Sequence, residues 1–179
     1  MNTPKNHAVI LLEKEYEDLE FWYPLLRMRE TGIEAQVTAP VSGKIYHSKH
    51  GYPVISDSTP ADINPADIGL LIIPGGHAPE HMVRHPDMVQ LVRNVHMSGG
   101  LIAFICHGGL LACSADILNG RRATSTPAIR DEMEKAGTDW HDEPVVVDDR
   151  LISSRCPDDL PAFCRAIFEE TGHRFTTLV

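Results

Sequence analysis

A cysteine lies in this sequence where a buried strand gives way to a helix. The apolar run 101–105 is followed by Cys106, His107 and the glycines Gly108 and Gly109. Such a turn points its side chain beyond the carboxyl end of the sheet, where α/β proteins bind ligands. The free N–H groups at a helix start favour the thiolate. We therefore predict that Cys106 is a nucleophile that attacks a carbonyl carbon; the alternative is a buried structural cysteine.

A second glycine turn follows another apolar strand. Residues 68–73 are almost entirely aliphatic, and Pro74, Gly75 and Gly76 end the run. If the two strands are neighbours, the N–H groups of Gly75 and Gly76 face Cys106. Together with the N–H of His107 they would form an oxyanion hole. An ordinary turn at a strand end explains the same residues equally well.

Acidic residues gather after the first apolar run, and most of them suit a solvated helix start. The cluster comprises Glu13, Glu15, Glu17, Asp18 and Glu20. One carboxyl projecting inward could hydrogen-bond the cysteine sulfur or carry a proton.

Histidines at 77, 81 and 85, next to Glu80, have the spacing of one helix face, which could indicate a metal. The H-E-x-x-H order is absent, however, and Pro79 and Pro86 limit a helix here. We predict neither a metal nor a cofactor. The three other cysteines have neither ligand spacing nor a turn context: Cys113, Cys156 and Cys164.

The bulk composition restricts the class of protein. A length of 179 residues with 42% hydrophobic residues suits a single domain, 1–179, with a real core. The net charge of −9, without a basic stripe, argues against nucleic-acid binding. No apolar run is long enough to span a membrane, and the polar first residues do not resemble a signal peptide. Four cysteines without C-x-x-C spacing predict a reducing, cytoplasmic location.

Strand-like and helix-like segments alternate along the chain, which is typical of a mostly parallel sheet with helices on both faces. A small antiparallel excursion is expected at 43–57, a connector at 60–67, and a hairpin with an Asp-Asp tip at 144–153. The other strands are expected at 8–12, 34–39, 68–73 and 101–105, and the helices at 18–31, 86–97, 110–118, 129–136 and 157–170.

Several blocks in this order resemble the ThiJ/PfpI superfamily, and within it the PfpI-type intracellular cysteine proteases and amidases. The resemblance covers nearly the whole chain, and the joint order of the blocks makes it specific. The blocks are 16–20 with Tyr23 and Pro24, then 49–54, 73–80, 105–108, 142–148 and 157–163.

This resemblance implies a flavodoxin-like three-layer sandwich related to class I glutamine amidotransferases. It implies that Cys106 is the nucleophile with His107 beside it, and that Glu20 is the inward glutamate next to the sulfur. Glu80 matches an acidic residue that completes a Cys-His-Glu triad from an adjacent subunit. The protein is therefore expected to be a homo-oligomer, either a dimer or a hexameric ring of dimers. Gly75 and Gly76 match the oxyanion turn.

Two positions depart from the family pattern. Phe104 lies two residues before the cysteine, where a small residue is usual, and Gly109 replaces a common proline. The first would reshape the site and the second would loosen the helix start, but neither removes a reacting group.

Three functions follow from these residues. The leading hypothesis is a cysteine hydrolase that cleaves amide or peptide bonds in a small-molecule or peptide substrate. The second is implied by the resemblance, because relatives in this family act as cofactor-independent glyoxalases or deglycases. Here the thiolate would add to an α-oxoaldehyde or act on a glycated substrate. The third is a redox-responsive stress or chaperone-like protein, because an exposed thiolate is also readily oxidised.

Overall fold

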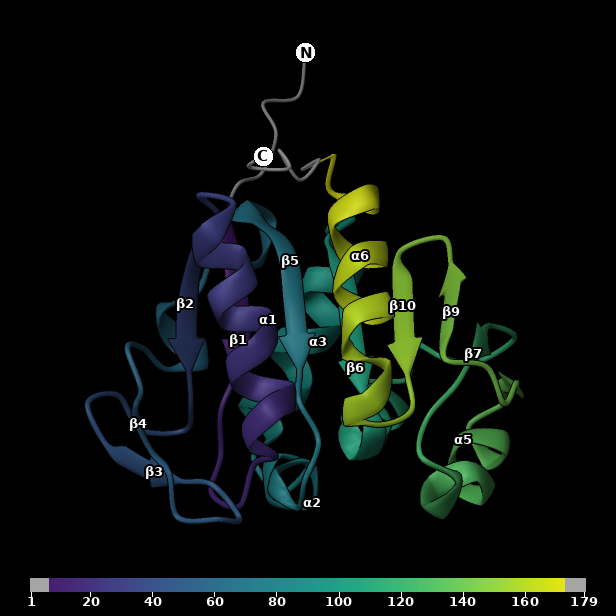
Figure 1. Ribbon diagram of the computed structural model, residues 1–179, viewed down its shortest axis with the longest axis horizontal. Helices are drawn as coiled ribbons and strands as arrows, with labels where there is room; N and C mark the ends of the chain where they lie inside the picture. Colours follow the sequence, from purple (N-terminus) through teal and green to yellow (C-terminus); the bar gives the residue numbers. More distant parts are fainter. Residues whose placement is uncertain (1–6, 173–179) are drawn as a thin grey trace.

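The computed structural model describes residues 7–172, and residues 1–6 and 173–179 lie outside the described part. Figure 1 shows one central sheet between two layers of helices. The six strands follow the order β2-β1-β5-β6-β10-β9. Five of them run parallel, and only the edge strand β9 is antiparallel to its neighbour β10. The predicted α/β fold with a mostly parallel sheet is confirmed.

The central strands are aliphatic runs buried on both faces, as expected for a parallel sheet covered by helices. All five residues of β6 and all but one of the six residues of β5 are buried. The strands of the sheet are β1 (His7–Leu11), β2 (Glu34–Thr38), β5 (Ile68–Ile73), β6 (Leu101–Ile105), β9 (Val145–Asp148) and β10 (Leu151–Ser154).

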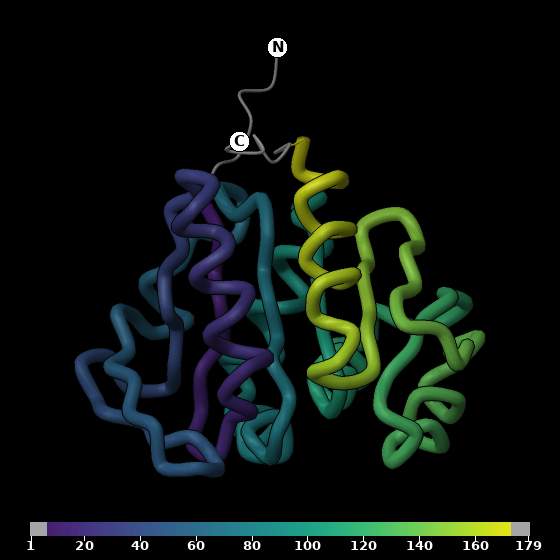
Figure 2. Tube along the Cα trace, in the orientation of Figure 1, coloured from purple at the N-terminus to yellow at the C-terminus, as the bar shows by residue number. Residues whose placement is uncertain are grey.

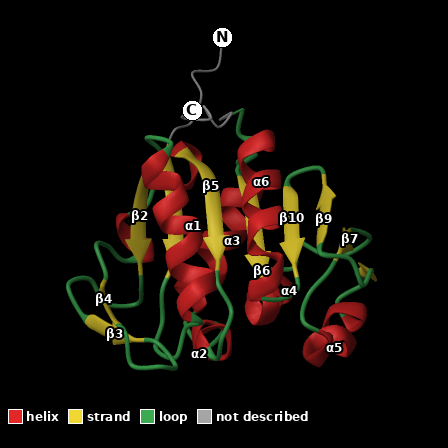
Figure 3. Cartoon of the chain, viewed as in Figure 1, coloured by secondary structure: helices red, strands yellow, loops and turns green. Residues whose placement is uncertain are grey.

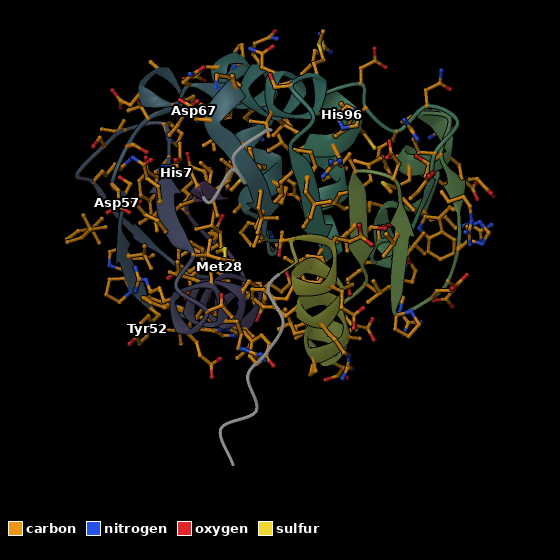
Figure 4. All side chains as sticks on the ribbon, turned by 90° about the horizontal axis from the view of Figure 1, so that it is seen from above. His7, Met28, Tyr52, Asp57, Asp67 and His96 are labelled. Atoms are coloured by element: carbon orange, nitrogen blue, oxygen red, sulfur yellow. The ribbon has the colours of Figure 1, made fainter. Side chains whose placement is uncertain are left out.

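The helices divide between the two faces of the sheet. Helices α1 and α6 contact each other on one face, whereas α3 and α4 cover the other. Seen from above, Met28 of α1 and His96 of α3 lie on opposite sides of the strands (Figure 4). The helices are α1 (Asp18–Glu30), α2 (Ala78–Met82), α3 (Pro86–Met97), α4 (Gly109–Ser114), α5 (Arg130–Lys135) and α6 (Leu160–Glu170).

The five parallel strands of the sheet point toward one end of the molecule, where α2 also lies (Figure 3). Strands β5 and β6 are neighbours, with Ile73 paired to Phe104. Their carboxyl ends therefore bring the Gly75–Gly76 turn next to the Cys106 turn, as the sequence predicted conditionally. Elements distant in sequence thus meet at this end of the sheet.

Both predicted antiparallel segments are confirmed. Strands β3 (Ile45–His47) and β4 (Pro53–Ile55) form a separate two-stranded ribbon at the side of the molecule (Figure 2). Strands β9 and β10 form the hairpin, and Asp149 at its tip adopts a φ of 54°.

Other local predictions need correction. Helix α4 ends at Ser114 rather than at residue 118, because Asp116 adopts the left-handed φ of 57°. One expectation holds instead: Pro79 and Pro86 limit the helix in this region. Helix α2 has five residues, with Pro79 in its first turn, and it ends before His85. The short parallel pair β7 (Arg122–Ala123) and β8 (Asp139–Trp140) was not predicted.

Candidate active site

Cys106 lies in a strained turn at the end of β6. Its φ is 60°, in the left-handed region that L-residues other than glycine seldom adopt. A short 3₁₀ turn, Cys106–Gly108, then leads into α4. The cysteine is partly exposed while all of β6 is buried, so the turn lifts the sulfur out of the core. Strain at a partly exposed nucleophile is a common feature of functional sites.

The glycine turn after β5 packs tightly against this cysteine. A Cβ on Gly75 would lie 2.5 Å from Oε2 of Glu20 and 2.7 Å from Cβ of Cys106. Gly76 adopts a φ of 75°, and a Cβ there would lie 2.5 Å from the backbone nitrogen of Glu17. Only glycine fits at either position, because any side chain would displace a neighbouring element.

Glu20 projects into the interior from the first turn of α1. It shares the inward face of the helix with Pro24, Leu25 and Met28, and its exposed fraction is 0%. One oxygen, Oε2, accepts a hydrogen bond of 2.8 Å from the amide of Gly75. The other oxygen, Oε1, is buried without a hydrogen-bond partner among the described residues. A buried carboxyl with one open oxygen favours its neutral form.

The carboxyl of Glu20 and the thiol of Cys106 shift each other's proton affinity. Burial raises the pKa of Glu20 to about 7, against the opposing effect of the Gly75 N–H. Burial, and after it the negative charge of Glu20, raises the pKa of Cys106 to about 12. The N–H groups of His107 and Gly76 lower the pKa of this thiol, but their effect is smaller.

The pKa of Cys106 is raised, whereas the helix start alone led us to expect that it would be lowered. In the resting site the sulfur keeps its proton, and Glu20 titrates near neutrality. A thiol beside a carboxyl of this kind can pass its proton to the carboxylate when a carbon–sulfur bond forms. The arrangement is therefore suited to proton transfer coupled to attack rather than to a free thiolate.

The predicted oxyanion donors have different surroundings. The amide of Gly75 is engaged by Glu20, so it is not free to bind an oxyanion. The amides of Gly76 and His107 instead stabilise negative charge on the sulfur. These two N–H groups remain the candidates for an oxyanion hole.

His107 lies beside the cysteine, with 3.3 Å between its Nδ1 and the Cys106 sulfur. Burial holds the pKa of His107 below its ordinary value, while the charge of Glu80 acts in the opposite direction. Glu80 is an exposed residue of α2. Within residues 7–172, no hydrogen bond joins it to His107 in the single chain.

Sequence reasoning missed an ion pair next to the site. Glu17, which precedes α1, pairs with Lys49 from the turn between β3 and β4. The bond to Glu17, and after it the charges of Glu17, Glu20 and Cys106, raise the pKa of Lys49. Lys49 belonged to one of the blocks that carried the family resemblance, but its type and spacing indicated no role.

Two of the three histidines considered as metal ligands, His81 and His85, bind separate carboxylates. Nε2 of His81 lies 2.8 Å from Glu15, and Nε2 of His85 lies 3.3 Å from Glu13. Four residues of the acidic cluster after β1 form ion pairs, namely Glu13, Glu15, Glu17 and Asp18. The remaining member, Glu20, faces the cysteine.

The two departures from the family pattern fit each other. Phe104 is fully buried, with its ring beside the start of α4. A Cβ on Gly109 would lie 2.8 Å from the sulfur of Met133 and 3.0 Å from Cδ1 of Ile129. Because Gly109 has no side chain, Met133 and Ile129 can pack there next to the large ring of Phe104.

Among the other cysteines, Cys156 comes nearest to this arrangement, because its sulfur lies 3.6 Å from Oδ2 of Asp159 at the start of a short 3₁₀ turn. Burial raises the pKa of Cys113 to about 11 and that of Cys164 to about 12, with no carboxyl–amide arrangement like that of Glu20 and Gly75.

In residues 7–172, no helix has the length and apolar character needed to cross a membrane.

The chain matches known proteins over most of its length. The model of the DJ-1/PfpI family matches residues 6–170. The protein named deglycase PfpI from Pyrococcus furiosus is 41% identical over 157 residues, which are 88% of this chain and 94% of that protein. Protein/nucleic acid deglycase 2 from Escherichia coli is 37% identical over 165 residues, 91% of this chain and 96% of the relative.

A solved structure agrees with the fold. It is a two-domain protein from Anabaena variabilis with DJ-1/ThiJ/PfpI-like and ferritin-like domains, and it aligns with a TM-score of 0.91 at 36% identity. The alignment covers 93% of this chain but only 48% of the other. This chain therefore spans about half the length of that two-domain protein.

Proposed function

The chain belongs to the DJ-1/PfpI family, and we propose that it is an enzyme that uses Cys106 and Glu20 on α-oxoaldehydes or their adducts, as a glyoxalase or deglycase. Relatives that carry the name deglycase support this function over the amide hydrolysis favoured by sequence reasoning. The observation that carries the proposal is the fully buried Glu20 carboxyl, which the Gly75 amide holds over 2.8 Å next to the Cys106 turn. Burial raises the pKa of this carboxyl to about 7 and also favours the protonated thiol.

The first step is addition of the sulfur to the aldehyde carbon. The thiol proton passes to ionised Glu20 as the carbon–sulfur bond forms, because a thiol with a pKa of about 12 does not ionise by itself at neutral pH. Negative charge develops on the aldehyde oxygen, where the N–H groups of Gly76 and His107 stabilise it. Glu20 then gives this proton to the charged oxygen, so the product is a neutral hemithioacetal on Cys106 and Glu20 is ionised again.

The second step is an internal proton shift. Ionised Glu20 removes the proton from the former aldehyde carbon and delivers it to the adjacent carbonyl carbon. The hydroxyl proton of the hemithioacetal moves to the oxygen of that carbonyl, which gives a 2-hydroxyacyl thioester. Water then releases the 2-hydroxy acid and restores the thiol. For methylglyoxal the balance is aldehyde plus water to lactate, so no external oxidant or reductant is required.

The direct test is lactate formation from methylglyoxal in the absence of glutathione. Cys106→Ser and Glu20→Gln should each lose at least about 100-fold in kcat/KM, because each removes a reacting group. Cys156→Ser, which changes a partly exposed cysteine elsewhere on the chain, should retain activity. Equal turnover by the wild type and Cys106→Ser would contradict the proposal.

A second measurement separates the two substrates within this class. The protein is mixed with a preformed hemithioacetal of methylglyoxal and a small thiol, and the decay of the adduct is followed. A deglycase makes the adduct decay faster than its spontaneous dissociation. If the rate never exceeds that limit, the enzyme consumes only the free aldehyde and is a glyoxalase.

Amide hydrolysis remains a second candidate because of one distance. Nδ1 of His107 lies 3.3 Å from the Cys106 sulfur, as a cysteine–histidine pair requires. In that reaction His107 protonates the leaving amine, and Glu80 from another subunit orients the ring. Small peptide amides cleaved by the wild type but not by Cys106→Ser would support this function.

The third hypothesis, a redox-responsive protein, also centres on Cys106. Mass spectrometry after mild peroxide treatment tests it, and an unmodified Cys106 would contradict it.

A further inference from the structure

The ion pair between Glu17 and Lys49 lies next to the Gly75–Gly76 turn of the candidate site. The side chain of Glu17 is only 8% exposed, whereas that of Lys49 is 40% exposed. The backbone N–H of Glu17 donates to the carbonyl of Gly75 over 3.2 Å, and that of Lys49 donates to Tyr16 over 3.1 Å. Both partners are therefore fixed by the same segment that holds the glycine turn.

Glu17 is the charged group that would otherwise disturb Glu20. The two carboxyls lie three residues apart at the start of α1, and the charge of Glu17 raises the pKa of Glu20. The ammonium of Lys49 opposes this by pairing with Glu17 and by acting on Glu20 directly. A nearly buried carboxylate needs such a partner, since it is poorly solvated on its own.

The other titratable groups around Glu20 are few. Cys106 faces it from the end of β6, and the pKa of this thiol is too high to change charge near neutrality. His107 follows Cys106, and its own charged neighbours are Glu80, His77 and Lys49. Asp18 and His50 also lie within 4.8 Å of the Glu17 carboxylate, but they pair with each other over 2.7 Å. Lys49 is thus the cation that pairs with Glu17 and that also acts on Glu20, Cys106 and His107.

We propose that Lys49 is a positioning residue whose ion pair with Glu17 sets the pH range in which Glu20 accepts the proton of Cys106. This inference rests on the proposed role of Glu20 as the base. Without Lys49, Glu17 is an unpaired negative charge beside Glu20, and Glu20 holds its proton to higher pH. The enzyme then loses the base at the pH where the wild type works.

The experiment compares Lys49→Met with Lys49→Arg, Glu17→Gln and the double variant Lys49→Met/Glu17→Gln. The pH dependence of kcat/KM for methylglyoxal is measured for each. Lys49→Met should move the acid limb upward by roughly 0.5 to 1 pH unit, because repulsion replaces neutralisation. Glu17→Gln should move it downward, Lys49→Arg should leave it in place, and the double variant should lie near the wild type.

A second measurement does not depend on activity. The Glu20 carboxyl is titrated by carbon-13 NMR, with its signal assigned by its absence in Glu20→Gln. The same shifts in the same variants should appear there. If the wild type proves inactive on every α-oxoaldehyde but the Glu20 titration follows the predicted order, the proposed function fails while the ion pair's role stands.

Two results would overturn the proposal. The first is an unchanged Glu20 titration in folded Lys49→Met. The second is a change confined to KM for negatively charged α-oxoaldehydes with an unmoved acid limb, because that pattern means that Lys49 binds substrate directly.

Discussion

The amide of Gly75 donates a hydrogen bond of 2.8 Å to the buried carboxyl of Glu20, a residue 55 positions away in the chain. This bond joins the first turn of α1 to the end of β5 directly beside Cys106. It fixes one carboxyl oxygen and leaves the other, Oε1, without a hydrogen-bond partner among the described residues. One oxygen of the carboxyl is thus held by the backbone, and the other has no partner that would compete for a proton.

Gly75→Ala should disrupt this arrangement. The new Cβ would lie 2.5 Å from the carboxyl oxygen of Glu20 and 2.7 Å from Cβ of Cys106, so α1 and the cysteine turn must separate. We expect a loss of about 2 kcal/mol or more in the free energy of unfolding, together with most of the activity. Urea denaturation and kcat/KM measure the two effects.

Gly43→Ala is the matched control. Gly43 adopts a φ of 70°, but a Cβ there would meet nothing within 4 Å. Its cost should be about 1 kcal/mol from backbone conformation alone, with activity retained. Gly75 is not among the glycines with a positive φ, so a loss there reports packing; a Gly75→Ala variant as stable as the wild type would contradict the tight packing.

The raised pKa of Glu20 predicts a pH dependence of stability. In the folded protein this carboxyl binds its proton up to about pH 7, whereas the ordinary value is 4.5. Between these values the native state holds more protons than the unfolded state, so stability falls as pH rises. Over that window the cost is on the order of 3 kcal/mol.

Glu20→Gln tests this linkage because it removes the titration. The variant should gain stability relative to the wild type between pH 5 and pH 8 by about that amount, as measured by urea unfolding at both values. Glu34→Gln, at an exposed glutamate of β2, provides the control and should show no such change. A wild-type stability that rises across this window relative to Glu20→Gln would contradict the raised pKa.

Much of the fold could be predicted because its signals are local. Runs such as 68–73 and 101–105 are aliphatic over their whole length, and glycine and proline mark their ends. The paired strands β7 and β8 could not be predicted, because each has only two residues, too few to show any periodicity. The early end of α4 could not be predicted either, because it depends on the left-handed backbone conformation of Asp116.

The candidate site was predictable as a set of residues but not as an electrostatic system. The turn at Cys106 and the glycines after β5 are visible in sequence, and the register of β5 with β6 brings them together. The raised pKa of Cys106 arises from burial and from Glu20 on another element. The role of Lys49 depends on a contact with Glu17 across the fold. A helix-start argument includes neither of these long-range terms.

The left-handed backbone of Cys106 predicts a trade-off between activity and stability. A residue with a Cβ at a φ of 60° is strained, whereas glycine is not. Cys106→Gly should therefore be more stable than Cys106→Ala by about 1 kcal/mol, although both are inactive. Thermal unfolding of the two variants isolates the strain, since neither has the sulfur. A less stable glycine variant would show that the turn stores no strain.

Glu80 gives the last prediction, which concerns assembly. It is exposed on α2 and forms no hydrogen bond to His107 within the described part of the single chain. If a neighbouring subunit supplies Glu80 to His107, Glu80→Gln should lower peptide amide hydrolysis while Cys106→Ser abolishes it. When Glu80→Gln and Cys106→Ser are unfolded, mixed and refolded together, peptide amide hydrolysis should then be restored.

The restored fraction follows from the symmetry of the assembly. In a mixed dimer, the site with an intact Cys106 receives an intact Glu80 from its partner, so random pairing restores about a quarter of wild-type sites. Light scattering verifies that oligomers form, and each variant refolded alone is the control. No restoration in a mixture that contains hybrid oligomers would mean that Glu80 acts, if at all, within its own chain. Full activity of Glu80→Gln would remove it from the reaction altogether.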